Sequence, residues 1–207
     1  MTSPAPTIDP KRTALLVMDF QHGVVERMPG LDSLLARVQQ AITDVRDHGG
    51  TIAYVRVAFT EADWAAIPPT NAIFSRVGEN HLMHDEDRST AIDNRLAPQP
   101  GDIVVRKTRV GAMSTTDLDR QLRDRGIDTL VLAGLSTSGV VLSTLIEAAD
   151  RDYRLYVLSD GTDDPDAQAR DVLLGKVFPR RAQVIEIAGL RTLLQGTSVT
   201  TPQGGPR

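Results

Sequence analysis

Short apolar runs alternate with amphipathic stretches along this chain, and the alternation predicts strands and helices in turn. Six apolar runs have the length and composition of buried strands, and each is bounded by Gly, Asp, Pro or Arg. They cover residues 14–18, 52–57, 103–106, 129–133, 155–158 and 184–187. Apolar residues recur at helical spacing in residues 31–47, 116–125 and 140–153. The first of these helices is expected to stop at Gly49-Gly50.

This order of elements predicts an α/β fold with three layers, in which helices cover both faces of a parallel, six-stranded, Rossmann-like sheet. We expect one domain over residues 1–195 and a disordered polar tail over residues 196–207. Residues 68–97 are irregular and predict a long crossover with one short helix, capable of covering a pocket. Ligands of such sheets bind outside the carboxyl ends of the strands.

Composition narrows the possible partners of this chain. The 207 residues carry a net charge of -4 from 23 basic and 27 acidic residues, which are scattered along the sequence. No basic stripe indicates nucleic acid, and no apolar segment is long enough to span a membrane. We therefore expect a cytoplasmic protein that binds a small molecule. The absence of cysteine excludes disulfides, thiolate zinc sites and thiol nucleophiles together.

Three segments that follow predicted strands carry the candidate chemistry. Residues 134–144 read GLSTSGVVLST, a strand-turn-helix junction whose first helical N–H groups suit an oxyanion or phosphate. Asp19 ends the first strand and Lys107 ends the third. Each is ambiguous alone, since Asp19 could cap a loop and Lys107 could lie on the surface. Together they predict a carboxyl group that a neighbouring ammonium prepares to accept or donate a proton.

Three blocks of sequence resemble the successive signatures of the isochorismatase-like, or cysteine hydrolase, superfamily. They are ALLVMDFQHGV, GDIVVRKTRVGAMSTTDLDRQLRDRGIDTLVLAG and GLSTSGVVLSTLIEAADRDYRLYVLSDGTDD, and the resemblance spans roughly residues 12–188. It implies a hydrolase with a six-stranded parallel sheet and a homodimer or homotetramer. That family includes nicotinamidases, N-carbamoylsarcosine amidohydrolase-like enzymes and isochorismatases.

The resemblance assigns the family's catalytic aspartate to Asp19, its lysine to Lys107 and its nucleophilic cysteine to Val140. It also implies a cis peptide bond at Ser136-Thr137. A valine side chain has neither a lone pair nor an acidic proton, so thioester chemistry cannot run through position 140.

Three mechanisms remain open. In the first, Asp19 donates a proton for addition of water to a vinyl ether, as the isochorismatase branch does. Lys107 then binds the substrate or polarises it, and N–H groups near Gly139 and Val140 contact the substrate, which is anionic. The segment LSTSGVV, however, lacks the histidine and tyrosine of that branch.

In the second mechanism, Ser138 or Ser143 replaces the thiol as nucleophile, although Ser138 suits a helix N-cap better. In the third, the chain binds a metabolite or a partner without catalysis. The retention of Asp19 and Lys107 argues against that reading, although a buried ion pair can also persist as structure.

The remaining candidates concern binding. We predict substrate contacts from Gln21, Phe59, Arg109, Ser136, Thr137, Ser138 and Gly139. Arg76, Arg106 and Arg109 are candidates to hold a substrate carboxylate, and Phe20, Phe59, Trp64 and Phe74 line a pocket or pack in the core. Residues 57–61 lack the Asp-x-His pattern of the family's metal-dependent amidases, and His81 and His84 have no matching carboxylate. We therefore expect a hydrolase that needs neither a metal nor a cofactor. Its expected substrate is a small organic molecule, and this class includes anionic molecules.

Overall fold

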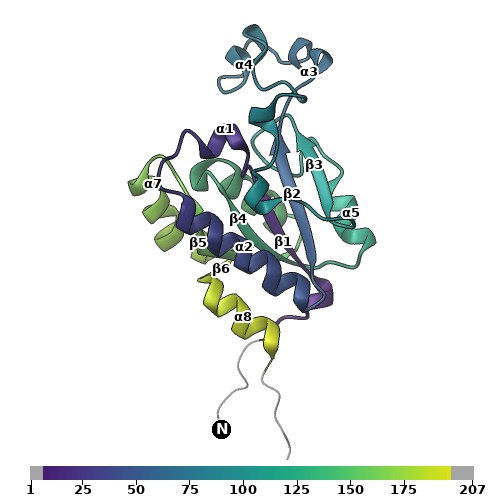
Figure 1. Ribbon diagram of the computed structural model, residues 1–207, viewed down its shortest axis with the longest axis vertical. Coiled ribbons are helices and arrows are strands. Elements are labelled where there is room, and N and C mark those ends of the chain that lie inside the picture. Colours follow the sequence, from purple (N-terminus) through teal and green to yellow (C-terminus); the bar gives the residue numbers. More distant parts are fainter. Residues whose placement is uncertain (1–6, 197–207) are drawn as a thin grey trace, which may run out of the picture.

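The computed structural model describes residues 7–196, and its strands form one parallel sheet. Within these residues the six strands follow the spatial order β3-β2-β1-β4-β5-β6, with every neighbouring pair parallel (Figure 1). The strands are β1 (Thr13–Met18), β2 (Thr51–Val57), β3 (Ile103–Lys107), β4 (Thr129–Leu135), β5 (Arg154–Asp163) and β6 (Gln183–Ile185). The predicted six-stranded α/β architecture is therefore confirmed.

Helices connect the strands and cover both faces of the sheet. The α-helices are α1 (His22–Val25), α2 (Asp32–Asp47), α3 (Glu61–Ala65), α4 (Ser75–Glu79), α5 (Leu118–Asp124), α6 (Leu142–Ala149), α7 (Ala167–Val172) and α8 (Ile187–Gln195). Shorter 3-10 turns are η1 (Pro10–Arg12), η2 (Arg88–Thr90), η3 (Asn94–Leu96) and η6 (Phe178–Arg180), and π-helical turns are η4 (Thr137–Val141) and η5 (Leu173–Val177). No helix in residues 7–196 is long and apolar enough to cross a membrane.

Two apolar clusters lie on opposite faces of the sheet, because successive side chains of a strand point to opposite sides. Leu15 and Val17 of β1 pack with residues of α2 and α8 in one cluster. Leu16 and Met18 pack with residues of α5 and α6 in the other. Figure 1 shows α2 and α8 together over one face. Because β1 is buried along its whole length, the fold holds its carboxyl end firmly in place.

Several predicted boundaries are wrong at the carboxyl end of the chain. Strand β5 continues to Asp163, past a shift in its register with β4, instead of ending at residue 158. The last strand ends at Ile185, because the Ile187 N–H donates to Asp160 Oδ1 (2.9 Å) and starts α8. Helix α6 spans only eight residues of the predicted 140–153 and follows the wide turn η4. The predicted tail lies, apart from Gly196, outside the described residues.

A long excursion separates β2 from β3 and carries α3, α4, η2 and η3. Residues 68–97 contain one α-helix, α4, as predicted. Figure 1 shows α3 and α4 standing away from the sheet, beyond the ends of β2 and β3. Ion pairs tie the excursion to the two strands: Arg56 contacts Asp85, and Arg106 lies 2.5 Å from Asp63. These contacts hold the excursion above the edge of the sheet where ligands bind.

Candidate active site

Asp19 and Lys107 meet at the carboxyl edge of the sheet, although their strands are separated by β2. The Asp19 N–H donates to the carbonyl of Val55 on β2 (2.8 Å), and Asp19 adopts a left-handed φ of 60°. A non-glycine residue rarely adopts this conformation, so the strand ends there in a sharp change of direction. The Lys107 Nζ lies 2.8 Å from Asp19 Oδ2. The predicted approach of lysine to aspartate is thus confirmed.

The ammonium group of Lys107 is buried and fully occupied. It donates to the carbonyl oxygens of Arg109 (3.3 Å) and Val110 (3.0 Å) in addition to its contact with Asp19. A lysine ammonium has three donors, so these contacts account for all of them. Lys107 is therefore fixed in place as a positive charge beside the carboxyl group.

Asp19 keeps one oxygen without a partner. Oδ1 is buried and accepts no hydrogen bond within the described residues, whereas Oδ2 contacts Lys107. Burial raises the pKa of Asp19, and the nearby charge of Lys107 opposes this effect without cancelling it. The result is a carboxyl group that holds a proton above its ordinary pKa and has an oxygen available to transfer it.

The turn after β4 is held by hydroxyl and carboxylate groups. The Ser136 Oγ accepts from the Gly139 N–H (3.1 Å), so Ser136 caps η4. A side chain at Gly139 would bring its Cβ within 2.7 Å of that oxygen, which explains the glycine. The Thr137 hydroxyl hydrogen-bonds that of Thr162 (3.0 Å). The cis peptide bond of this turn lies at Leu135-Ser136, so the predicted position at Ser136-Thr137 is wrong by one residue.

Asp164 closes this turn from the end of β5. Its Oδ2 accepts from both the N–H and the hydroxyl of Ser138 (2.7 Å each), and its Oδ1 accepts from the Asp166 N–H (3.1 Å). Burial alone would raise the pKa of Asp164, but these hydrogen bonds outweigh it and lower the pKa. The N-cap expected at Ser138 is at Ser136 instead, because the Ser138 hydroxyl donates to Asp164.

A cavity of about 370 Å³ joins the Asp19–Lys107 pair to the turn. Its lining residues are Asp19, Val24, Arg27, Met28, Val57, Phe74, Lys107, Val110, Leu135, Ser136, Gly139, Val140 and Pro165. Val140 is buried and presents an apolar side chain to this cavity. The cavity thus combines one buried carboxyl group with a mainly apolar wall.

Of the predicted substrate contacts, Ser136 and Gly139 line this cavity and the others do not. The Gln21 amide is buried and bonds Val57 and the Thr90 carbonyl. Phe59 is also buried, in an apolar cluster behind Phe74. The Arg109 guanidinium donates to the Thr108 carbonyl (2.6 Å). Thr137 and Ser138 make the turn contacts described above.

Part of the cavity wall was missed from the sequence. Val24, Arg27 and Met28 come from α1 and the turn after it, and Pro165 follows β5. A helix of four residues has too few positions to show a periodic pattern, so sequence reasoning had no signal for α1.

The predicted aromatic and histidine candidates lie in different parts of the structure. Phe74 lines the cavity, while Phe20 packs in the core. Trp64 lies in the excursion, where the His81 ring stacks on it at 4.6 Å and the His84 ring is tilted against it. Among residues 7–196, no three His, Cys, Asp or Glu side chains are grouped so that they could hold a metal ion.

The fold is that of an isochorismatase-like hydrolase, and the aspartate-lysine pair lies at the carboxyl edge of its sheet. The model of the isochorismatase domain matches residues 13–189. The chain belongs to the isochorismatase family.

Relatives agree with this assignment. An uncharacterized isochorismatase family protein of Bacillus subtilis (strain 168), YwoC, is 32% identical over 173 residues, which cover 84% of this chain and 89% of that protein. The ureidoacrylate amidohydrolase RutB of Methylobacterium radiotolerans is 31% identical over 75% of this chain and 68% of its own length. The structure of an isochorismatase family protein from Burkholderia thailandensis has a TM-score of 0.77 at 28% identity, covering 93% of this chain and all (100%) of that one.

Proposed function

We propose that this protein hydrolyses a small organic molecule by acid-base catalysis at Asp19, without a covalent intermediate. The observation that carries the proposal is the environment of Asp19. One of its oxygens is held by Lys107, the other is buried without a partner, and the group lines the cavity. A carboxyl group with a raised pKa and a free oxygen is suited to give a proton to a bound substrate and to take one back.

For a vinyl ether the steps balance as follows. The protonated Asp19 gives its proton to the terminal alkene carbon, and the ether carbon becomes an oxygen-stabilised cation. Water adds to that carbon and loses a proton to the Asp19 carboxylate, which restores the acid. In the resulting hemiketal the hydroxyl group gives its proton to the ether oxygen as the bond between that oxygen and carbon breaks, so that a carbonyl group and a free alcohol are formed. The fixed charge of Lys107 helps Asp19 to remain ionised between the two proton transfers.

Position 140 favours this chemistry over the thioester route. Val140 cannot attack a carbonyl carbon, and it is buried in the wall of the cavity. The name of RutB describes an amide hydrolysis, so an amide remains within the class of substrates to be tried.

A serine nucleophile is the second candidate, and the geometry gives it less support. The Ser138 hydroxyl donates to Asp164, whose lowered pKa makes it a weak base. Ser138 is also absent from the lining of the cavity, and Ser143 lies within α6.

A substrate screen tests the proposal. Wild-type protein and Asp19→Asn are incubated with vinyl ethers, amides and esters, and consumption is followed by mass spectrometry. The asparagine side chain keeps the shape of the aspartate but cannot transfer a proton. We expect the wild type to consume one class and the variant to consume it at least about 10²-fold more slowly, with no mass added to the protein. An adduct on Ser138 or Ser143 would support the serine route instead, and binding without consumption would support a non-catalytic role.

A further inference from the structure

The charges around the cavity do not balance. Among the described residues, the charged side chains that line it are Asp19, Lys107 and Arg27. Asp19 and Lys107 pair with each other at 2.8 Å. None of the ion pairs or side-chain hydrogen bonds found within residues 7–196 involves the Arg27 guanidinium. Beyond this pair, Arg27 adds a positive charge that no carboxylate of the described residues compensates, and the charge is carried by a planar group with five donors.

The backbone that carries Arg27 is anchored on two sides. The Gln21 amide, just before α1, accepts from the Val57 N–H and donates to the carbonyls of Val57 and Thr90. One residue into α1, a Cβ at Gly23 would lie 3.0 Å from Ser89, so this glycine allows α1 and η2 to approach closely. The Arg27 N–H then donates to the Val24 carbonyl (3.2 Å) and continues the helical turn. The main chain that carries Arg27 is thus held in place by its neighbours.

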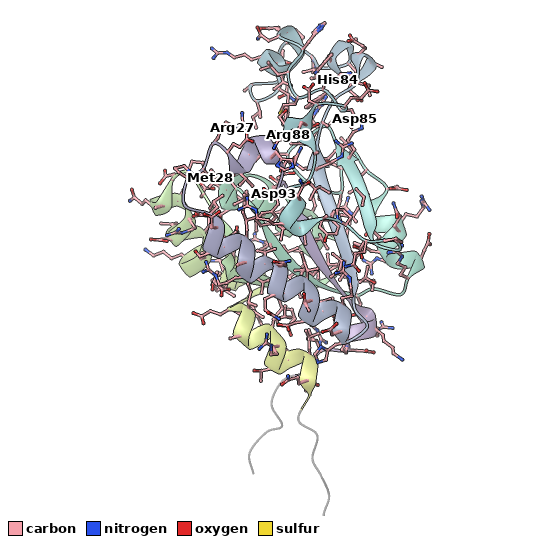
Figure 2. All side chains as sticks on the ribbon, viewed as in Figure 1. Arg27, Met28, His84, Asp85, Arg88 and Asp93 are labelled. Atoms are coloured by element: carbon pink, nitrogen blue, oxygen red, sulfur yellow. The ribbon has the colours of Figure 1, made fainter. Side chains whose placement is uncertain are left out.

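Arg27 also borders a second cavity, of about 520 Å³, between α1 and the excursion. The two cavities share Val24 and Arg27. Glu26 and Asp87 line the second cavity, yet no carboxylate of the described residues forms an ion pair with Arg27. Figure 2 shows Arg27 next to Met28 beside α1, below the part of the excursion that carries His84 and Asp85. The guanidinium therefore stands at the border of the reaction cavity, exposed to an incoming ligand.

The three arginines predicted from the sequence as candidates to bind a substrate carboxylate are not placed to do so in this cavity. Arg106 is occupied by Asp63 and by the carbonyl of Ala58. Arg109 donates to its neighbour's carbonyl, and Arg76 lies on α4 away from the cavity lining.

We propose that Arg27 selects the substrate by binding a carboxylate group at the mouth of the cavity. This inference rests on the proposed function, since it concerns the same site. A guanidinium pairs with a carboxylate through two parallel hydrogen bonds, which gives both charge and orientation. The apolar body of the same molecule then packs against the apolar wall that includes Val24, Met28 and Phe74. The substrate class is a small carboxylic acid with an apolar body.

Two probes that share one ring test this inference through binding, and mass spectrometry checks that neither probe is consumed. Benzoate carries a carboxylate, and benzamide replaces it with a neutral group of similar shape. Dissociation constants are measured by calorimetry for wild type, Arg27→Gln and Arg88→Gln. Arg88 is an exposed arginine of η2 that lines neither cavity, so its variant removes an equal charge elsewhere. Circular dichroism checks that each variant is folded.

We expect the wild type and Arg88→Gln to bind benzoate about tenfold more tightly than benzamide, as one charge-assisted contact allows. Arg27→Gln should lose that preference and bind benzamide as before. Equal binding of both probes by the wild type, or an unchanged preference in Arg27→Gln, would overturn the inference. Asp19→Asn separates the two proposals. Turnover that survives this change contradicts the role of Asp19 as the acid, whereas the preference for benzoate over benzamide tests the role of Arg27 alone.

Discussion

Two aspartates stand at the carboxyl edge of the sheet, and their surroundings differ in a way that separates chemistry from structure. Asp164 has both oxygens occupied by donors of its own chain, and its pKa is lowered. Asp19 has one oxygen held by Lys107 and one without a partner, and its pKa is raised. A fully bonded carboxylate holds a turn together, while a buried carboxyl group with a free oxygen is prepared for proton transfer.

Removal of the proton from Asp19 should have the largest effect on turnover. We expect Asp19→Asn to lower kcat by about 10²- to 10⁴-fold, because that is the range lost with a general acid or base. The asparagine oxygen still accepts from Lys107, so the fold should persist. Steady-state kinetics with the substrate found in the screen, together with circular dichroism, measure both effects. Near-normal kcat in this variant would place the acid elsewhere.

Removal of the Lys107 ammonium group should lower the free energy of unfolding as well as the turnover. Lys107→Met leaves the buried Asp19 without its partner, and such a change costs about 3–5 kcal/mol of unfolding free energy. It should also raise the pKa of Asp19 further. Urea unfolding measures the loss, with Lys11→Met as the control, since Lys11 is exposed in η1. A loss no larger than that of the control would mean that the pair contributes little.

Asp164, which holds the turn after β4, should respond differently to the loss of its charge. Asp164→Asn weakens the bonds from Ser138 and Asp166, and we expect a loss of about 1–3 kcal/mol in unfolding free energy. Because the folded pKa of Asp164 is lowered, its stabilisation is complete above the ordinary value of 3.8 and is lost as the pH falls through the folded pKa. The gap between wild type and variant should therefore close in acid. The exposed Asp47→Asn serves as the control. A gap that widens on acidification would reverse the assignment.

The smallest effect on turnover is expected at position 140. Val140→Ala removes apolar contacts from the cavity wall but no reacting group, so kcat should change by less than about fivefold, or about 1 kcal/mol. Stability should fall by about 1.6 kcal/mol for two buried methylene equivalents. Kinetics and thermal unfolding of the same sample measure the two quantities. A collapse of kcat at unchanged fold would give this position a role that valine's chemistry does not explain.

The sequence predicted some parts of this site and missed others for physical reasons. Asp19 and Lys107 were found because each directly follows an apolar strand, and parallel strands bring such ends to one edge. The role of Gln21 was not found, because its partners Val57 and Thr90 are far along the chain. Arg27 was missed for the same reason: a cavity wall depends on how α1 and the excursion pack, which no local pattern records.

The pH dependence of turnover tests the central claim most directly. If protonated Asp19 starts the reaction, kcat of the wild type at saturating substrate should be high in acid and fall as the pH rises through one ionisation above 3.8, the ordinary value for aspartate. Circular dichroism at each pH limits the profile to conditions in which the protein is folded. A rate that instead rises through that ionisation would contradict the account, since the ionised carboxylate would then be the active form.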